Sequence, residues 1–513
     1  IGPAIGAAVL HNAEQIVNSD GTTSFLPNRN IYMAALAAAV LLVVILCVIF
    51  RVMRNGHHRL ISQAGEELLD RLADDGVGTR SDECEGDAAG WSPRGENGEE
   101  SVVHEGVSGE DVHDKGNGEE TVWGRYPRPQ MRRSSFFSLN GCWQLNGQQI
   151  LVPFPPQSLL SGYQGHVGAD LVYSRCFEVP FAWKGGRILL HFGAVDQVAD
   201  VFVNEHFTGR HEGGYLPFSF DVTEYLQEGE NKLVVKARDT LSHIYPYGKQ
   251  RKNRGGMWYT PVSGIWQSVW LECVPEVYIR KLDIAADTSK VCITVMSSED
   301  SGGSEPERRY KTAGDGIQVA IRLHNGSICT VHGESNQVEV DLTDIQLEDG
   351  TYYQPAAWTT EHPYLYEMTV TMGEDTISSY FALRTIEIKK VDGMPRVCLN
   401  GEPIFLHGVL DQGYFCDGIY LPARETEYEQ DILRMKNLGF NLLRKHIKIE
   451  PECFYYYCDM HGMLVMQDMV NNGSYLFSRD TALPTLGMTR QKDTRRLGSR
   501  RRKEFFEVHM RET

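Results

Sequence analysis

The sequence predicts a multidomain, β-rich protein in which one transmembrane helix is followed by two β-sandwiches and a region of alternating strands and helices. Three observations support this order. An unbroken apolar run extends from Ile31 to Phe50, short alternating runs of β-branched and aromatic residues begin after Trp123, and the hydrophobic period lengthens after Arg384. These changes in pattern divide the chain into successive segments with different structures.

The composition indicates several globular domains and argues against nucleic-acid binding. The 513 residues are 42% hydrophobic and 23% charged, which is enough for separate cores. The net charge of -18 and the pI near 5.4 do not suit the neutralisation of phosphates. Basic residues cluster from Arg495 to Lys503, but few aromatic residues interleave with them, so a solvated loop and helix start is favoured there.

Cysteine usage favours a reducing compartment. The 11 cysteines are scattered along the chain from Cys47 to Cys458, and they show neither CxxC spacing nor a paired histidine cluster. Zinc sites depend on such spacing, and small disulfide-rich folds depend on a dense set of cysteines. The sequence therefore predicts neither a zinc site nor a disulfide framework.

The apolar segment from Ile31 to Phe50 is predicted to cross a membrane, after an N-terminal segment of residues 1–30. About 20 helical residues span a hydrocarbon core about 30 Å thick. A secretory signal peptide is the alternative, but its apolar region is usually about 7–15 residues long. Arg51, Arg54 and Arg59 follow the span, so the positive-inside rule places the C-terminal domains in the cytoplasm. We therefore expect a single-pass membrane protein.

Residues 55–122 are predicted to form a flexible acidic linker. After a short helical stretch around Glu66–Leu72, this segment has almost no aliphatic side chains, so it cannot bury enough apolar surface to offset the entropy of ordering. An interaction tail or a calcium-binding tract is the alternative. Because the carboxylates lack the order of an EF-hand loop, a solvated spacer is preferred.

Two antiparallel β-sandwiches are predicted over residues 123–276 and 277–386. The first contains the alternating runs Arg187–Phe192, Ala199–Glu205 and Lys232–Ala237, which turn residues separate. Alternation turns one face of each strand toward a core and leaves the other face in water. The pattern by itself specifies all-β domains and no particular function.

Residues 387–513 alternate strands and helices, as in the N-terminal part of a parallel barrel. A proline suits the first turn of one helix, and glycines suit the positions after helix ends. The expected strands are Phe405–Val409, Asn441–Arg444 and Met463–Met466, and the expected helices are Thr426–Asn437 and Pro451–His461.

Several sequence blocks resemble glycoside hydrolase family 2 in their order and spacing. They include Leu139-Asn-Gly-Cys-Trp143, Gly213-Gly-Tyr-Leu-Pro-Phe218 and Gly264-Ile-Trp-Gln-Ser-Val-Trp-Leu-Glu272 in the first sandwich. His362-Pro-Tyr-Leu-Tyr366 is similar to an element of the family's immunoglobulin-like domain. The resemblance implies a jelly-roll-like, sugar-binding β-sandwich, an immunoglobulin-like β-sandwich and an incomplete (β/α)8 TIM barrel in a truncated chain.

Four candidate substrate-binding residues lie at the expected carboxyl ends of the barrel strands: Asp411, Arg444, His446 and Asp468. Arg444 resembles the family arginine that supports the nucleophilic carboxylate. The family usually has two residues between this arginine and a sugar-binding histidine, whereas only Lys445 precedes His446 here. A structural ion pair between Arg444 and Asp468 is the alternative interpretation. In this family, the long loop around residues 245–256 reaches toward the active site.

The resemblance implies a glycosidase that hydrolyses a terminal β-linked sugar with retention. Such a reaction needs two carboxyl groups about 5–5.5 Å apart. In this family both are glutamates on later barrel strands, and the first of them follows an asparagine. The pair Asn204-Glu205 lies in the sandwich and cannot take this role, so both glutamates are expected beyond Thr513. The 513-residue chain alone is therefore expected to be inactive. The alternative is a non-catalytic carbohydrate-binding or vestigial membrane-anchored protein.

The expected partners are a carbohydrate substrate and, through the helix from Ile31 to Phe50, a membrane. No organic cofactor and no nucleic acid is expected. No cluster in the sequence has enough oxygen ligands to indicate a metal site. The identity of the sugar and the oligomeric state stay open.

Overall fold

The computed structural model describes part of the chain. The described residues are 13–17, 23–27, 123–299, 316–473, 475, 480, 482–485, 487 and 498–513. The chain divides into two compact units, residues 1–110 and residues 111–513. In the first unit, strands β1 (Ala13–Val17) and β2 (Thr23–Pro27) pair in antiparallel fashion.

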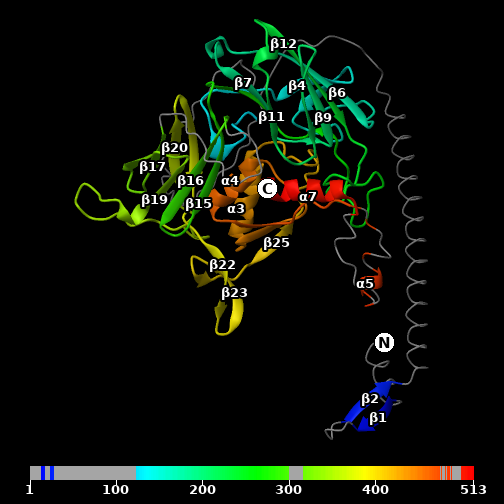
Figure 1. The fold of residues 1–513 in the computed structure, drawn as a ribbon. Helices are drawn as coiled ribbons and strands as arrows, with labels where there is room; N and C mark the ends of the chain where they lie inside the picture. The colour runs from blue at the N-terminus through cyan, green and yellow to red at the C-terminus, as the bar shows by residue number, and fades with distance from the viewer. Residues whose placement is uncertain are drawn as a thin grey trace, which may run out of the picture. The chain divides into compact units, whose positions relative to one another are not determined.

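The second unit begins with a β-sandwich made of a six-stranded and a four-stranded sheet (Figure 1). In sheet order, the larger sheet contains β10 (His206–Glu212), β9 (Val198–Val203), β12 (Glu230–Arg238), β6 (Asp170–Glu178), β4 (Gly141–Leu145) and β5 (Gln148–Val152). The smaller sheet contains β11 (Phe218–Asp221), β7 (Arg187–Phe192), β14 (Val269–Val274) and β3 (Phe136–Ser138). Five short elements complete this sandwich: β8 (Val195–Asp196), β13 (Gly264–Ile265), η1 (Pro129–Met131), η2 (Phe181–Trp183) and η3 (Thr223–Tyr225).

Alternating side chains build the core of this sandwich. On β12, Leu233, Val235 and Ala237 are buried while the residues between them face outward or are partly covered. Trp143 and Trp270 are also buried, so these large rings contribute to packing.

A second sandwich follows, made of a three-stranded and a four-stranded sheet. The three strands are β15 (Ile279–Ala286), β16 (Lys290–Ser297) and β19 (Gln337–Asp341), and η4 (Leu342–Asp344) follows the last. The four strands are β18 (Ile328–Gly333), β17 (Ile317–Arg322), β20 (Tyr366–Met372) and β21 (Asp375–Phe381). The predicted multidomain, β-rich architecture with two sandwiches is confirmed.

A buried ion network joins the two sandwiches. The guanidinium of Arg133 lies 2.9 Å from an oxygen of Glu272 on β14 and 2.7 Å from an oxygen of Asp375 on β21. Burial raises the pKa of Glu272, but Arg128 and Arg133 outweigh burial, so the net shift is well below the usual range. Because the three charges of Arg133, Glu272 and Asp375 are out of water, their pairing fixes how the two sandwiches meet.

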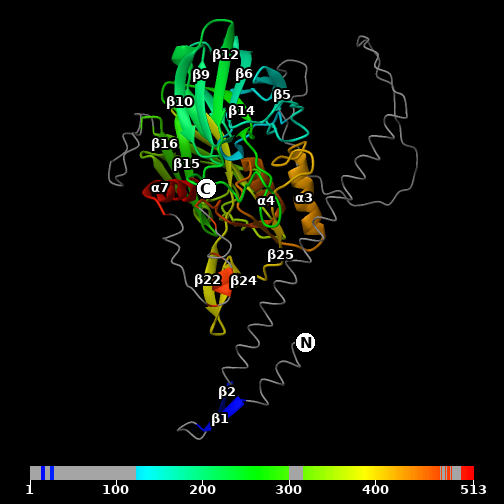
Figure 2. The same cartoon turned by 90° about the vertical axis from the view of Figure 1, so that its right-hand side faces the viewer.

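Alternating strands and helices follow a β-hairpin that projects from the rest of this unit (Figure 2). The hairpin sheet contains β22 (Ile386–Val391), β23 (Met394–Leu399) and β24 (Glu402–Pro403). The next elements are β25 (Gly408–Asp411), α3 (Thr426–Asn437), β26 (Leu442–Lys445), α4 (Glu452–His461) and β27 (Leu464–Gln467), with α5 (Leu483–Thr485) and α7 (Arg500–Glu512) after them. Strands β25, β26 and β27 form a parallel sheet. The incomplete barrel stays a prediction.

The two helices between these strands follow local sequence signals. Helix α3 has the predicted bounds, and Gly439, just beyond its end, adopts a left-handed φ of 87°. Helix α4 follows Pro451 and ends at His461, and the next residue, Gly462, has a φ of 71°. Glycine tolerates this region because it has no Cβ. The first strand, in contrast, begins three residues later than expected, at Gly408.

The sequence predicts a single-pass membrane protein with its domains in the cytoplasm, and the structure contradicts this localisation. None of the helices in the described ranges is long and apolar enough to cross a membrane. Helix α7 has 13 residues, which is a length of only about 20 Å at the α-helical rise. The segment from Ile31 to Phe50 and the arginines Arg51, Arg54 and Arg59 lie outside the described residues, as does the linker predicted over 55–122.

Candidate functional site

The four predicted site residues gather at one edge of the parallel sheet. Because β25, β26 and β27 run in the same direction, their carboxyl ends meet there. The backbone N–H of His446 donates to the carbonyl of Asp411 at 2.8 Å. The N–H of Asp468 donates to the carbonyl of Lys445 at 2.9 Å. Successive strand ends are thereby held in register.

Three of the four residues form an outer cluster, defined as Arg444, His446 and Asp468. Arg444 donates from Nε to Asp468 Oδ1 at 3.1 Å, and its Nη2 lies 3.1 Å from Oδ2. His446 Nδ1 lies 2.9 Å from the same Oδ2. The Arg444 side chain is 53% exposed, so the cluster is accessible from solvent.

The charge of the outer cluster is fixed by these contacts. Burial opposes ionisation of Asp468, but the hydrogen bonds from His446 and Arg444 outweigh it, so the pKa of Asp468 is lowered. The carboxylate is therefore ionised near neutral pH and accepts from both neighbours. The ion pair between Arg444 and Asp468, the alternative interpretation of these residues, is present in the structure.

A loop of the first sandwich completes this cluster. Lys249 Nζ lies 3.1 Å from His446 Nε2. The rings of Tyr259 and His446 meet edge to face, with centroids 6.3 Å apart. Nδ1 of His446 thus faces the Asp468 carboxylate, and its Nε2 faces the ammonium group of Lys249. Lys249 and Tyr259 are thus additional site residues.

The loop is anchored by a buried amide. Gln250 donates from Nε2 to Tyr215 Oη at 3.1 Å and to Asp196 Oδ2 at 3.3 Å, while its Oε1 accepts from the N–H of Val262 at 2.7 Å. Gln250 is 1% exposed. Burial, then the nearby Asp239 carboxyl, raises the pKa of Asp196 well above its usual range. A protonated Asp196 avoids a buried, uncompensated charge behind the loop.

Asp411 belongs to a different set of contacts, the inner network, defined as Asp411, Lys445, Lys448, Glu450 and Tyr428. Lys445 Nζ donates to Asp411 Oδ2 and to Glu450 Oε1, both at 2.7 Å. Lys448 Nζ lies 2.8 Å from Glu450 Oε2, which also accepts from the Tyr428 hydroxyl at 2.7 Å. Lys445, Lys448 and Glu450 are at most 3% exposed.

The inner network keeps Asp411 charged. Burial raises the pKa of Asp411, but Lys445 outweighs burial through its charge and its hydrogen bond, so the net pKa is lowered. Burial lowers the pKa of Lys448 to about 8, against the opposing effect of Glu450. The Asp411 carboxylate therefore belongs to the inner network, and Asp411 meets the outer cluster through its backbone carbonyl, which accepts from the N–H of His446.

Lys249 and Tyr259 escape identification from the sequence alone. The sequence locates their loop, because the resemblance places residues 245–256 near the active site, but it gives no pairing across 197 positions between Lys249 and His446. The feature of the sequence that could have drawn attention to this loop is its run of lysine and arginine residues. Within the described ranges, no group of three or more His, Cys, Asp or Glu residues is arranged to hold a metal ion.

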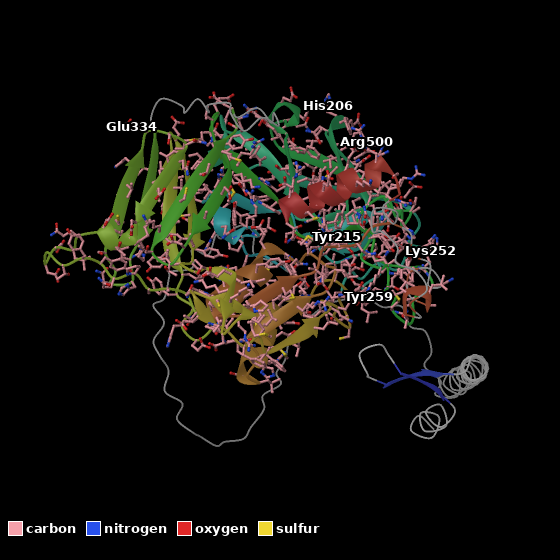
Figure 3. All side chains as sticks on the ribbon, turned by 60° about the horizontal axis from the view of Figure 1, so that its bottom comes forward. His206, Tyr215, Lys252, Tyr259, Glu334 and Arg500 are labelled. Carbon is pink, nitrogen blue, oxygen red and sulfur yellow. The ribbon has the colours of Figure 1, made fainter. Side chains whose placement is uncertain are left out.

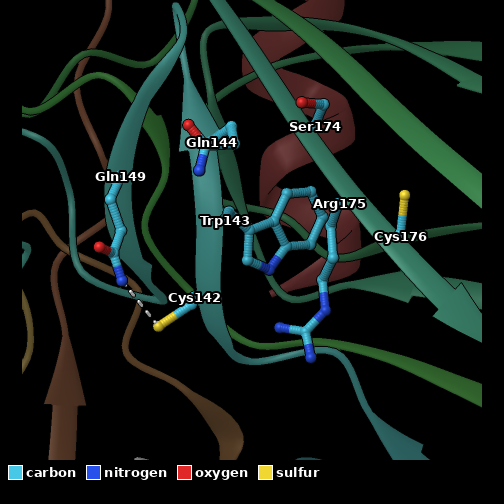
Figure 4. A pocket seen from close by; sticks show the side chains of 7 residues that line it. All are labelled: Cys142, Trp143, Gln144, Gln149, Ser174, Arg175 and Cys176. Carbon is cyan, nitrogen blue, oxygen red and sulfur yellow. Dashed lines mark hydrogen bonds between the residues drawn. The ribbon is translucent and has the colours of Figure 1, made fainter.

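A hollow of about 240 Å³ lies elsewhere, on the first sandwich (Figure 4). Its polar groups already serve the fold, because Arg175 donates to the carbonyls of Leu139 and Asn140, and Trp143 donates to the carbonyl of Leu139. Its lining residues are Cys142, Trp143, Gln144, Gln149, Ser174, Arg175 and Cys176. The hollow shares no residue with the outer cluster.

Two stretches of the chain match known domain families. Residues 136–275 match the domain described as "Glycosyl hydrolases family 2, sugar binding domain". Residues 277–384 match the domain described as "Glycosyl hydrolases family 2". The two stretches correspond to the two β-sandwiches, so the family resemblance noted in the sequence is confirmed.

Curated relatives carry two enzyme names. The chain is 29% identical over 317 residues to a beta-galactosidase of Thermoanaerobacter pseudethanolicus, covering 58% of this chain and 39% of that protein. It is 27% identical over 317 residues to a beta-glucuronidase of Bacteroides fragilis, covering 59% of this chain and 44% of that protein. The matches therefore span less than half the length of either relative.

Solved structures share the fold. A Lactobacillus rhamnosus beta-glucuronidase superposes with a TM-score of 0.56 at 22% identity, covering 76% of this chain and 65% of that chain. An uncultured Clostridium sp. beta-glucuronidase gives a TM-score of 0.51 at 23% identity, covering 66% of this chain and 60% of that chain. At these identities the likeness shows a shared fold, and the reaction has to be argued from the residues of the site.

Proposed function

As this chain belongs to glycosyl hydrolase family 2, we propose that it takes part in the hydrolysis of O-glycosidic bonds to a terminal β-linked sugar. The observation that carries the proposal is the outer cluster. It presents the hydrogen-bonding groups of Arg444, His446 and Asp468 at the carboxyl edge of a parallel sheet, where Lys249 of the sugar-binding-type sandwich meets them.

These groups suit the binding of a sugar ring. Sugar hydroxyls donate and accept hydrogen bonds, and the cluster offers cationic donors beside an ionised acceptor. Tyr259 adds an aromatic ring at the same place. In the proposed role, Arg444 and Lys249 donate to sugar oxygens, Asp468 accepts from a hydroxyl, and Asp411 positions the strand end through Lys445.

The retaining reaction belongs to the proposal as well. It requires a proton donor and a nucleophile, two carboxyl groups about 5–5.5 Å apart. Asp411 and Asp468 are each held in ion pairs that favour their charged form, which suits binding better than proton donation. We therefore assign sugar binding to the four site residues, and we expect the two catalytic glutamates to be other residues of the protein.

The test measures binding and turnover separately. Methyl β-D-glycosides are titrated into the 513-residue chain by calorimetry, and nitrophenol release from nitrophenyl β-D-galactoside and β-D-glucuronide is assayed in parallel. We expect binding that Arg444→Ala weakens, without turnover by this chain. Turnover that Arg444→Ala abolishes would mean that the catalytic carboxyl groups are already present, and the absence of both binding and turnover would contradict the proposed site.

A carbohydrate-binding protein without catalysis is the second candidate, favoured by the ion-paired state of both aspartates. The protein purified from its natural source separates the two candidates. Its intact mass is compared with 57.8 kDa, and its turnover of the same nitrophenyl glycosides is measured. Turnover supports the hydrolase, whereas binding without turnover by the natural protein supports the carbohydrate-binding role.

A further inference from the structure

We propose that Asp196 and Asp239 act as a clamp on the two ends of the loop of residues 250–263. While the two carboxyl groups hold a proton, the clamp keeps Lys249 and Tyr259 at the outer cluster. Both aspartates are thus positioning residues, which act on a ligand through the loop and do not touch it. The effect on ligand binding rests on the proposed function, whereas the clamp itself can be tested without a ligand.

The start of the loop depends on the carboxyl group of Asp196. Gln250 donates from Nε2 to Asp196 Oδ2 at 3.3 Å, and its Oε1 accepts from the backbone N–H of Val262 at 2.7 Å. One side chain therefore links the start of the loop to its end. Asp196 also pairs through its backbone with Gly264, the first residue after the loop, because β8 and β13 form an antiparallel ladder. Asp196 thus contacts both ends of the loop.

The end of the loop depends on Asp239, which follows β12 and is buried. Ser263 donates from Oγ to Asp239 Oδ2 at 2.8 Å, and the N–H of Leu241 donates to Oδ1 at 2.7 Å. The N–H of Ser263 donates in addition to Gln157 Oε1 at 3.2 Å. Because β12 belongs to the six-stranded sheet, Asp239 ties the end of the loop to the body of the sandwich.

The clamped loop carries the contacts between the first sandwich and the outer cluster. Lys249 directly precedes Gln250, and its Nζ lies 3.1 Å from His446 Nε2. The N–H of Tyr259 donates to the carbonyl of Lys249 at 3.1 Å, and the Tyr259 ring meets His446 edge to face. Figure 3 shows Tyr259 in the same region of the unit as Tyr215, whose hydroxyl accepts from Gln250 Nε2 at 3.1 Å. Opening of the loop would therefore withdraw Lys249 and Tyr259 from the cluster.

The charges of the two aspartates are poorly compensated. In the described part of the chain, neither has a salt-bridge partner, and Asp196 Oδ1 is buried without a hydrogen-bond partner. A Cβ on Gly214 would collide with this oxygen, so the backbone packs closely against it. The titratable groups that face the pair from the surrounding described elements are Tyr215, Tyr414 and Lys252. Two ionised aspartates would thus be buried with one cation nearby, which is costly.

This environment makes the closed loop bind a proton. Burial, then the charge of Asp239, raises the pKa of Asp196 well above its usual range. Burial also raises the pKa of Asp239, against the hydrogen bonds from Leu241 and Ser263. In an open loop both carboxyl groups would meet water and have ordinary pKa values. The closed loop therefore binds more protons than the open loop, so a rise in pH above the ordinary pKa of aspartate favours opening.

The experiment follows hydrogen exchange of the loop amides in the full chain. Protection factors of peptides that cover residues 250–263 are measured by mass spectrometry at pH 6 and pH 8.5, and they are corrected for the effect of pH on intrinsic exchange. We expect protection in the natural sequence to fall about tenfold between these conditions, which corresponds to a difference of about one pKa unit between the closed and open loop.

Two substitutions of Asp196 separate the effect of the proton from that of the hydrogen bond. Asp196→Asn still accepts from Gln250 and cannot ionise, so the loop should stay protected at both pH values. Asp196→Leu has no acceptor, so protection should be low at both. Asp239→Asn should reduce the fall with pH, because one of the two charges is removed. Glu425→Gln is the matched control, since it changes another buried carboxyl group to an amide at the start of α3, and it should leave the fall unchanged.

Ligand binding is measured separately by calorimetry with methyl β-D-glucoside, which has no charge at either pH. We expect the natural sequence to bind this sugar about tenfold more weakly at pH 8.5 than at pH 6, following the loop. Asp196→Asn should bind it equally at both pH values.

The outcomes distinguish the clamp from the function beneath it. Loop protection that does not depend on pH, or that falls equally in Asp196→Asn, would overturn the clamp. If Asp196 variants do not fold, the natural sequence and Asp239→Asn decide in the same way. A pH-dependent loop with unchanged glucoside binding would overturn the positioning of Lys249. A failure of the glucoside to bind at either pH, with the loop behaving as expected, would contradict the proposed function and leave the clamp standing.

Discussion

Strand β26 carries charged residues on both of its faces, and the two faces differ in how completely those charges are compensated. Lys445 points inward, is 1% exposed, and contacts both Asp411 and Glu450. Arg444, its neighbour, is 53% exposed at its side chain and shares Asp468 with His446. The inner network is closed by its own protein partners, whereas the outer cluster keeps donors directed at solvent.

The difference follows from the cost of burying charge. A buried ammonium group without a partner is too costly to keep charged, so every inner charge has a counter-charge in contact. An exposed cation is solvated and needs no complete set of protein partners. Stability therefore depends mainly on the inner network, and ligand binding depends mainly on the outer cluster.

The largest expected effect is on the inner network. Lys445→Met leaves Asp411 without its ion-pair partner and Glu450 with one lysine fewer, so the free energy of unfolding should fall by about 3–5 kcal/mol. Urea denaturation measures the change. The matched change Lys184→Met, at an exposed pair, should cost less than about 1 kcal/mol. A loss below about 1 kcal/mol for Lys445→Met would contradict the contrast between the two faces.

Glu425 extends the comparison to a buried carboxyl group at the start of α3. Burial outweighs the nearby Arg125 and raises the pKa of Glu425 from 4.5 to about 7. Between these two pH values the folded chain binds a proton that the unfolded chain has lost, so this group makes stability fall as pH rises. The full effect is on the order of 3 kcal/mol.

Glu425→Gln should remove that fall. Unfolding in urea is measured at pH 5 and pH 7.5 for the natural sequence and for the variant, and the two changes with pH are compared. The variant should lose less stability than the natural sequence over this interval. An identical loss in both proteins would show that Glu425 ionises near its ordinary pKa.

A smaller effect, and one confined to binding, is expected at the outer cluster. Arg444→Ala should weaken binding of methyl β-D-glycosides about tenfold, or about 1.4 kcal/mol, while the unfolding free energy changes by less than about 1 kcal/mol. Arg434→Ala is the control, because Arg434 is an exposed arginine paired with Asp431 on α3. A large loss of stability in Arg444→Ala with binding unchanged would reverse the roles of the two faces.

The smallest effect is expected for Asp468→Asn. The amide still accepts a hydrogen bond but no longer carries the charge that holds Arg444 and His446. Binding of neutral methyl β-D-glucoside should weaken about threefold in calorimetry, and binding of methyl β-D-glucuronide should weaken less, because the local positive charge rises. An equal loss for both ligands would mean that Asp468 acts only by positioning its neighbours.

The sequence by itself determined the elements whose signals are local. Alternating apolar residues specify strands such as β12, and glycines after the helices specify where α3 and α4 end. The blocks shared with glycosyl hydrolase family 2 also indicated which strand ends would carry polar residues. These features depend on neighbours in the chain, so they can be inferred without coordinates.

Only the tertiary structure decided which polar residues belong to the inner network and which belong to the outer cluster. Asp411 and Asp468 look equivalent in sequence, yet one is held by Lys445 and the other by Arg444 and His446. Lys249 meets His446 from a different domain, 197 positions away. The physical reason is that the cost of a charge depends on its burial and its partners, and both are set by packing between distant segments.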